Sequence, residues 1–444
     1  MRLAAAVPVL SLVALITACG SEPSTRPSAL LVTLDTTRRD HLGCYGHTGG
    51  TSPSIDAVAA ESEVYDDAVS TSSWTLPAHA SLFTGQVPTR HQARYDEHGP
   101  LVLTQAIEGP FERYRVRGLR PDAVTLAQIL HDAGWATGGV VAGPWMKRVF
   151  GLDRGFAWWD DANIHEVNGR AADQVTDSAL GWIAQRGKEP FFLFLNYFDP
   201  HSPFDPPADW LRSHTTALLN DLVQLYDLEI RFMDEQLGRL VAGLRARGLW
   251  DDMLVVITAD HGELLGEHGL WGHGRMLSQE ELRVPLLIKF PARDGRRGRR
   301  AERAQLTDVL PTVLARLGLP LPEDVQGGVL PKTAHPVVAE LQVPPKIGDR
   351  GSFRALFDGS WKYVDTSLGA AMLYDVAADP GEDRDRSRDE AGRALSMREL
   401  LDSYLDALRR PVVESPDSVV DPDTVRALEA LGYMGEKKEK EGAK

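Results

Sequence analysis

The sequence predicts an α/β fold: a mostly parallel central sheet flanked by helices, followed by a smaller C-terminal subdomain of antiparallel sheet plus one helix. Two observations predict the larger part. Runs of large apolar residues without polar alternation recur along the chain, as expected for strands buried on both faces of a parallel sheet. Stretches with helical apolar spacing separate these runs. After residue 320 the runs shorten and turn signals multiply, which is typical of a small antiparallel sheet.

Length and charge exclude some functions. The 444 residues suffice for one large and one smaller domain, and 43% hydrophobic and 25% charged residues are ordinary for a globular protein. The net charge of −15 argues against nucleic acid as a partner. The basic run Arg296–Arg300 is expected to be a solvated loop, with contact to an anionic membrane surface left open.

The first residues predict export and lipid attachment. A positive start at Met1–Arg2 precedes the apolar stretch Leu3–Ile16, which is too short to span a bilayer comfortably. The sequence I-T-A-C ending at Cys19 resembles a bacterial lipobox, which makes residues 1–18 a signal peptide and Cys19 the site of a membrane anchor. An ordinary secretory signal is the alternative. By the same resemblance, Gly20 favours an outer-membrane location facing the periplasm or the outside.

The elements follow in order after a Ser- and Pro-bearing tether at residues 19–28. Buried strands are expected at Ala29–Leu34, Gly138–Val141, Pro190–Leu195, Met253–Ile257 and Val284–Phe290. Helices are expected at Thr75–Thr84, Thr125–Ala133, Ala171–Ile183, Leu222–Leu244 and Leu306–Leu317. The small sheet is expected at Val337–Leu341, Ala355–Phe357 and Lys362–Val364, with a helix around Ala391–Leu408 and a charged tail at 434–444.

Polar side chains stand at the ends of three predicted strands. Asp35 follows the first strand, Asp199 and His201 follow Pro190–Leu195 closely, and Asp260 with His261 follow Met253–Ile257. Ligands bind at the carboxyl ends of parallel strands, where neighbouring strands converge. The pattern therefore predicts a metal-centred site, whereas an isolated Asp–His pair would be only a solvated strand end.

Thr75 begins a helix. Pro77 suits the first helical turn and Gly85 suits the position after the last. Free N–H groups and the positive end of the helix dipole favour an anion at Thr75. A threonine hydroxyl is a poor nucleophile, but a metal ion and a helix N-terminus together could activate it. A plain capping role is the alternative.

Taken in order, these segments resemble the sulfatase family of the alkaline-phosphatase superfamily. The resemblance runs from Ala29 to about Glu382 and implies an alkaline-phosphatase-like domain at 29–320 with a C-terminal subdomain at 321–433. It is carried by L-L-V-T-L-D ending at Asp35, R-R-D-H-L-G-C-Y-G after it, T-L-P-A-H-A-S-L-F-T-G from Thr75, F-D-P-H-S-P at Phe198–Pro203, I-T-A-D-H-G-E at Ile257–Glu263, and the later R-V-P, W-K and L-Y-D segments.

The resemblance implies a site built on one divalent ion. Asp35, Asp260 and His261 would hold the ion, with the Thr75 hydroxyl as a further contact. His201 and His273 match positions that contact the anion. A histidine ligand favours zinc or manganese, and calcium stays open. A second ion at Asp199, His201 and His273 is conceivable, but the D-x-H spacing favours one.

The sequence also departs from the family. The nucleophile position carries Thr75, whose methyl group on Cβ prevents conversion to formylglycine. His79 replaces the motif arginine, and Arg94 and Lys147 are further candidates for substrate binding.

We therefore expect a metal-dependent ester hydrolase. Thr75 would be the metal-activated nucleophile that cleaves or transfers a phosphate ester, with His201 or His273 as acid or base. Nucleotide pyrophosphatase/phosphodiesterases and envelope phosphoethanolamine transferases are similar in using threonine. Two alternatives stay open: a sulfatase that acts on sulfate esters without formylglycine, and an inactive envelope lipoprotein that binds an anion.

Overall fold

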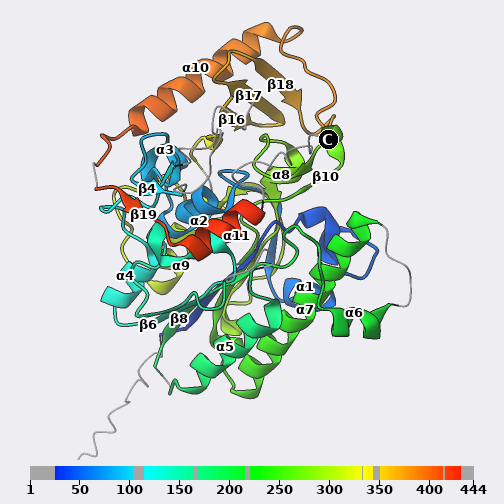
Figure 1. Ribbon diagram of the computed structural model, residues 1–444, viewed down its shortest axis with the longest axis vertical. Helices are drawn as coiled ribbons and strands as arrows, with labels where there is room; N and C mark the ends of the chain where they lie inside the picture. Colours follow the sequence, from blue (N-terminus) through cyan, green and yellow to red (C-terminus); the bar gives the residue numbers. More distant parts are fainter. Residues whose placement is uncertain are drawn as a thin grey trace, which may run out of the picture.

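The computed structural model describes residues 26–103, 115–164, 169–187, 189–215, 221–332, 334–343, 351–413 and 416–431. A nine-stranded mixed sheet lies at the centre with helices on both faces, and a four-stranded antiparallel sheet sits beside it with a long helix across it (Figure 1). The predicted fold class is confirmed. The predicted signal peptide and the charged tail lie outside the described residues.

The central sheet runs in the order β12-β2-β13-β9-β1-β8-β6-β7, and β14 pairs with β2. At its centre, β1 is parallel to both β8 and β9. The strands are β1 Ala29–Leu34, β2 Glu63–Val69, β6 Ala136–Val140, β7 Trp158–Asp160, β8 Phe191–Tyr197, β9 Leu254–Thr258, β12 Arg283–Val284, β13 Leu286–Lys289 and β14 Gly298–Gln305.

One predicted strand is two. The expected strand Val284–Phe290 is divided at Pro285 into β12 and β13, and both run antiparallel to β2. Proline has no N–H to donate to a ladder, which explains the interruption. β13 is also antiparallel to β9, so this edge of the sheet is mixed.

Side chains alternate between two apolar layers. Leu30, Val32 and Leu34 pack toward α1, α5 and α7, whereas Ala29 and Leu31 pack toward α2, α4 and α9. By this alternation, Thr33 and Asp35 continue on the α2 side. The helices are α1 Pro53–Ala59, α5 Ala172–Ala184, α7 Leu222–Ala246, α2 Thr75–Thr84, α4 Leu126–Asp132 and α9 Val309–Leu317.

The C-terminal region forms its own small sheet. It contains β15 Val337–Leu341, β16 Phe353–Asp358, β17 Trp361–Thr366 and β18 Ala371–Asp375, and α10 spans Ala391–Leu408 as predicted. The last described elements then return to the larger part. β19 (Ser418–Val419) pairs with β4 (Leu101–Val102), and α11 (Pro422–Ala430) buries Leu428 in the main core. The boundary at residue 320 stays a prediction.

The loop predicted for the basic run is found only in part, because Arg296 and Arg297 precede β14 whereas Arg299 and Arg300 lie in it. Gly298 begins β14, and the arginines around it bind carboxylates of the same sheet. The buried Glu63 carboxylate binds Arg296 at 3.0 Å and also Arg300, while Arg299 pairs with Asp66. These ion pairs join the residues at the start of β14 to carboxylates of β2, the strand that β14 pairs with.

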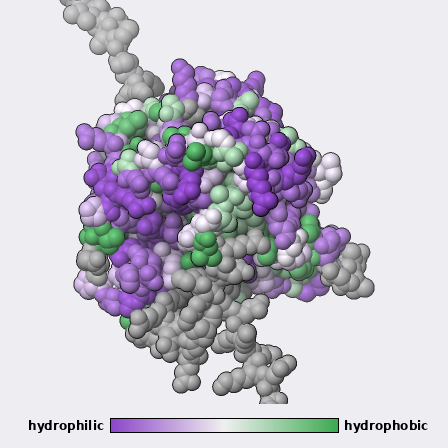
Figure 2. Space-filling view, turned by 90° about the horizontal axis from the view of Figure 1, so that it is seen from above, coloured by the Kyte–Doolittle hydropathy of each residue, from purple (hydrophilic) through white to green (hydrophobic). Residues whose placement is uncertain are grey.

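The face seen in Figure 2 is predominantly hydrophilic where it is coloured. Seen from above, hydrophobic side chains form small separate groups among polar ones (Figure 2). Leu395 and Leu400 on α10 are among the exposed hydrophobic residues. Within the described part of the chain, no helix combines the length and the apolar character that crossing a membrane requires.

Candidate active site

Three neighbouring strands deliver polar side chains to one edge of the sheet. The register places Thr33 beside Asn196 of β8 and beside Thr258 of β9. Asp35 and Asp260 each follow two residues later, so they lie on the same face and at the same level. This face is the one that α2 covers. Strand alternation therefore brings the two carboxylates together beneath the N-terminus of α2.

A metal-binding cluster results. Ligand atoms of Asp35, Asp260 and His261 lie within 4.8 Å of one another, and all three residues are fully buried. Asp35 Oδ1 and Asp260 Oδ2 have no hydrogen-bond partner among the described residues. Burying carboxylate oxygens without a partner is costly. The orphaned oxygens and the imidazole nitrogen are suitable donors for a divalent ion, so the residues fit the metal that the resemblance implies.

The pKa values of the Asp35 and Asp260 carboxyls are shifted in opposite directions. Burial, together with the nearby charge of Asp260, raises the pKa of Asp35 well above its usual range. Burial would also raise the pKa of Asp260, but His261, His79 and two backbone N–H donors outweigh it and lower that pKa. The donors are the N–H groups of His261 and Thr36, at 2.9 and 3.2 Å from Asp260 Oδ1.

His261 is oriented by its own loop. Its Nδ1 lies 2.9 Å from the carbonyl oxygen of Gly262, which leaves Nε2 directed at the cluster. His261 Nε2 is 3.3 Å from Asp260 Oδ2 and 3.2 Å from Thr75 Oγ1. Such fixing of the second ring nitrogen is common for metal-ligating histidines.

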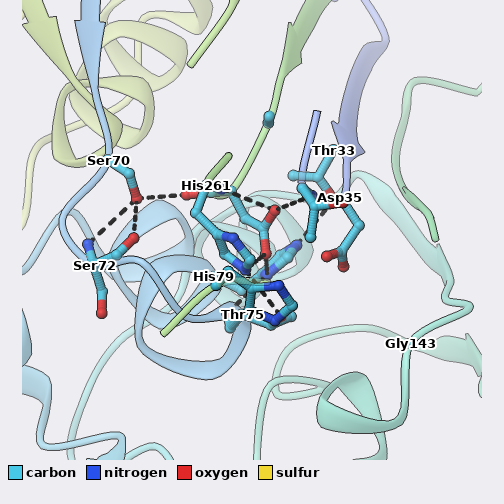
Figure 3. A network of polar contacts seen from close by, with 12 residues as sticks. Thr33, Asp35, Ser70, Ser72, Thr75, His79, Gly143 and His261 are labelled. Carbon is cyan, nitrogen blue, oxygen red and sulfur yellow. Dashed lines mark hydrogen bonds and ion pairs between the residues drawn. The ribbon is translucent and has the colours of Figure 1, made fainter. Parts of the chain in front are cut away.

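Thr75 is the first residue of α2 and is 1% exposed. Gly85 ends the helix with φ of 66°, as the sequence predicted. The Trp74 side chain does not cap the helix; it packs edge-on against Trp145 with ring centroids 4.9 Å apart. Asp35, Thr75 and His261 thus converge from β1, α2 and the loop after β9 (Figure 3).

His79 lies one helical turn beyond Thr75 and has no exposed surface. Its Nδ1 lies 2.9 Å from the Thr75 carbonyl oxygen, and its Nε2 lies 2.9 Å from Thr33 Oγ1. Burial lowers its pKa, which favours the neutral imidazole. Both nitrogens thus have partners inside the protein. The expected contact of His79 with substrate stays a prediction.

His201 and His273 extend the site from His261. The rings of His261 and His273 are 4.6 Å apart, and those of His273 and His201 are 4.7 Å apart. His273 Nδ1 is 3.1 Å from Glu263 Oε2. Burial lowers the pKa of both His201 and His273 well below the usual range, while it raises the pKa of Glu263 to about 8.

Asp199 faces a different space. It lines a polar cavity of about 260 Å³ together with His201 and Glu229. Burial raises the pKa of Asp199 to about 7, and Glu229 is 5% exposed. Among the described residues, Asp199, His201 and His273 are not grouped as metal ligands are. The conceivable second metal set is thus not assembled.

Arg94 and Lys147 are not among the grouped metal-ligating residues of the described chain. Arg94 is in β3 (Arg94–Tyr95), and in the described part of the chain it makes no hydrogen bond with Asp35, Asp260 or His261. Lys147 follows a short 3-10 helix, Pro144–Met146, that contacts both α2 and α11. Their role as substrate-binding residues stays a prediction.

Asn196 was missed by the sequence reasoning. Its Nδ2 donates to Asp35 Oδ2 at 3.1 Å, and its Oδ1 accepts from the N–H groups of Ala142 and Gly143 at 3.3 and 3.1 Å. The residue lies on the same face of β8 as Phe192 and Phe194, which pack on the α2 side. That alternation was the available signal.

Comparison with known proteins shows which family the chain resembles. A family model described as Sulfatase matches residues 27–319. The uncharacterized sulfatase YidJ of Escherichia coli is 24% identical over 87% of this chain and 88% of its own length. The choline-sulfatase of Rhizobium meliloti is 31% identical, over 74% of this chain and 76% of its own.

A solved structure shares the fold. The phosphonate monoester hydrolase of Agrobacterium radiobacter superimposes with a TM-score of 0.66 and 20% identity, covering 86% of this chain and 96% of that one. Together with the family match, this places the cluster at Asp35 and Thr75 in a known architecture. The chain belongs to the sulfatase family of the alkaline-phosphatase superfamily, and it is a hydrolase of ester bonds.

Proposed function

We propose that the protein cleaves or transfers a phosphate ester group and that Thr75 is its nucleophile. The observation that carries this proposal is the position of Thr75 Oγ1, at a helix N-terminus and 3.2 Å from Nε2 of the candidate metal ligand His261. The match to a phosphonate monoester hydrolase supports phosphorus as the reacting atom. The substrate class is an anionic ester.

Enzymes of this family use a divalent metal, and Asp35, Asp260 and His261 would hold it here. When bound, the ion would lower the charge cost of a threonine alkoxide and of the oxygens on phosphorus. We expect zinc or manganese because one ligand is an imidazole nitrogen. The Asn196 amide orients the Asp35 carboxylate by donating a hydrogen bond to it. The N–H groups of Thr36 and His261 orient the Asp260 carboxylate in the same way.

The reaction proceeds in two displacements. Thr75 Oγ1 forms a bond to phosphorus as the bond to the leaving oxygen breaks, and the hydroxyl proton is released. The leaving oxygen takes up a proton. Water or an acceptor alcohol then attacks phosphorus, the bond to Oγ1 breaks, and threonine regains its proton. In-line attack of this kind depends mainly on positioning and charge stabilisation.

His201 and His273 are the candidate proton donors and acceptors. They adjoin His261 through ring contacts, and Glu263 orients His273 through Nδ1. A positioned imidazole contributes about 10²–10⁴-fold as a general acid or base. The free N–H groups of the first turn of α2 lie beside Thr75, where they favour a bound anion.

His79 is a positioning residue in this proposal. It holds the Thr75 carbonyl oxygen and the Thr33 hydroxyl, and it lies 3.5 Å from Asp260 Oδ2. Its ring therefore connects the first turn of α2 to β1 and to the metal-binding carboxylate. This role replaces the substrate contact expected from the family motif.

The test compares three substrates on one preparation. Nitrophenyl phosphate, bis-nitrophenyl phosphate and nitrophenyl sulfate are assayed with wild type, Thr75→Ala and a matched control, Thr84→Ala, in the last turn of the same helix. We expect Thr75→Ala to reduce phosphate-ester turnover on the order of 10⁶-fold, as for deletion of a serine nucleophile. Mass spectrometry of a quenched reaction should find phosphate on Thr75. Unchanged turnover in Thr75→Ala would refute the proposal.

A sulfatase that acts without formylglycine is the second candidate. The observation that favours it is the family itself, including the choline-sulfatase relative at 31% identity. Sulfate turnover that exceeds phosphate turnover in the paired assay would select this candidate. Mass analysis of the peptide containing Thr75 also checks that the residue is unmodified.

We further propose that the protein is lipid-anchored in the cell envelope through Cys19, on the strength of the lipobox resemblance alone. Metabolic labelling with a fatty acid and detergent partitioning of wild type and Cys19→Ala test this. Equal labelling of the two proteins would contradict it.

A further inference from the structure

A second group of metal-ligating side chains lies outside the active site. His41 ends a short 3-10 helix (Arg39–His41), His47 follows a few residues later, and Asp227 lies in the first turns of α7. Ligand atoms of the three residues lie within 4.8 Å of one another. Among the described residues, only this group and the active-site cluster meet that condition.

The geometry of this group suits one small cation. His41 Nδ1 lies 2.6 Å from Asp227 Oδ1, and His47 Nε2 lies 3.6 Å from Asp227 Oδ2. The two imidazole rings are stacked, with centroids 5.3 Å apart and an angle of 23° between their planes. His47 Nε2 is buried and has no hydrogen-bond partner among the described residues. One ring nitrogen is thus aimed at the carboxylate without a bond to satisfy it.

The backbone of His41 and His47 and the ring of His41 are held in place by other contacts. The Thr51 hydroxyl donates to the His41 carbonyl oxygen at 2.5 Å, and the His47 N–H donates to the Leu42 carbonyl oxygen at 3.2 Å. Tyr226 packs edge-on against the His41 ring at 5.1 Å. A ligand set fixed in advance loses little conformational entropy when an ion binds.

Charge near the group also permits a cation. Arg231, one helical turn after Asp227 in α7, is bound to Glu235 at 3.1 Å and donates to the Gly50 carbonyl oxygen at 2.8 Å. Its charge is therefore compensated within α7. The side chains of His41, His47 and Asp227 are 12%, 21% and 25% exposed, so the group is reached from solvent.

We propose that His41, His47 and Asp227 bind a zinc-class divalent ion at a site separate from the active site. Two imidazoles and one carboxylate are the ligand types that zinc and the late first-row ions prefer, whereas calcium and magnesium prefer oxygen. Three protein ligands and partial exposure leave a coordination position for water, so the ion exchanges with solution. The proposal does not depend on the reaction assigned to Thr75.

The site joins the loop after β1 to α7. The Tyr226 hydroxyl donates to the Thr36 carbonyl oxygen and accepts from the Arg38 N–H, each at 2.8 Å. Thr36 directly follows the candidate ligand Asp35. An ion at Asp227, the neighbour of Tyr226, therefore stabilises the segment that shapes one side of the active site.

Zinc content tests the proposal. The full protein is stripped with a chelator, equilibrated with zinc and freed of unbound ion, and its zinc is measured by mass spectrometry. Asp35→Asn removes the active-site contribution, and His47→Gln and Asp227→Asn are then compared in that background. His98→Gln is the matched control, since the His98 side chain is 83% exposed. We expect one equivalent with the control and none with either test variant.

Thermal unfolding gives a second readout. In the Asp35→Asn background zinc should raise Tm, and the rise should vanish with His47→Gln or Asp227→Asn. If both variants retain the zinc equivalent and the zinc-dependent Tm of the control, the group is only an internal ion pair and the proposal is wrong. Two chemically different variants keep the test decisive if one fails to fold.

Discussion

Replacing Asn196 with aspartate probes the charge balance of the site. Asn196 is fully buried, and its Nδ2 donates to Asp35 Oδ2 at 3.1 Å. The variant Asn196→Asp keeps the size and keeps an acceptor for the N–H groups of Ala142 and Gly143. It removes the donor and places a second carboxyl beside Asp35.

The expected loss of stability depends on whether the introduced carboxyl stays ionised or takes up a proton. If the introduced carboxyl stays ionised, the lost hydrogen bond to a charged group costs about 1.5–3 kcal/mol. Repulsion at a spacing of roughly 3 Å and an effective dielectric constant of ~20 adds about 5 kcal/mol. If it takes up a proton instead, it donates to Asp35 as asparagine does. Protonating an aspartate of ordinary pKa at pH 7 costs about 4 kcal/mol. The cheaper route wins. Because the pKa of Asp35 is itself raised, that carboxyl can hold the shared proton at lower cost, so we expect a loss of at most about 4 kcal/mol at pH 7.

The same reasoning fixes the pH dependence. The folded-state pKa of the introduced carboxyl is raised, so the variant matches wild type below the unfolded pKa and loses stability as pH rises. The loss should grow by about 1.4 kcal/mol per pH unit above pH 4 until the folded-state pKa is reached. Urea unfolding of metal-free protein from pH 4 to 8 measures this difference, with exposed Asn163→Asp as the control. A difference that does not vary with pH would refute the reasoning.

Three further predictions concern the surrounding structure. Lys362→Met should lower the free energy of unfolding by about 3–5 kcal/mol in urea, because it leaves the Glu382 carboxylate buried without its partner. Lys362 Nζ lies 2.7 Å from that carboxylate, whose side chain is 3% exposed. Adding Glu382→Gln should recover part of the loss. Asp234→Ala should cost about 2–4 kcal/mol, since the N–H groups of Ser54 and Ile55 at 2.9 and 2.8 Å lose their acceptor; a cost below 1 kcal/mol, roughly that of one exposed hydrogen bond, would contradict it. Chelation should abolish turnover and lower Tm, because an ion at about 100-fold its Kd contributes ~2.7 kcal/mol; an unchanged Tm would argue against a metal at the active site.

Most of the metal-binding cluster could be predicted from the polar residues that follow the predicted strands. Asp35 and Asp260 follow two apolar runs, and they come together if those runs are neighbouring parallel strands. The observed pairing of β1 with β9 is parallel and has the register that this requires. The same logic applied to alternate residues of β8 would have found Asn196. Its amide carries no charge and so gives no signal of a metal site in the sequence. Its position beside Thr33 on the pleated sheet nevertheless lets it donate to Asp35.

Contacts between distant segments could not be predicted. The engagement of His79 depends on the Thr33 hydroxyl, which β1 presents on the face of the sheet that α2 covers. Pairing of Arg296 with Glu63 depends on β14 joining β2, a partner far away in the chain. Local composition gives the charge of such residues but not the carboxylate or hydroxyl that meets them.

The return of the chain's end to the larger part has a consequence for the order of folding. β19 completes a sheet with β4, and α11 buries Leu428 in the core that α2 and α9 also fill. A chain emerging from a ribosome or a translocon therefore holds an incomplete catalytic core until its last segments arrive. Non-local closure of this kind slows folding and prolongs exposure of apolar surface. Chains that end early, before α11, should depend on chaperones even though every active-site residue is already present.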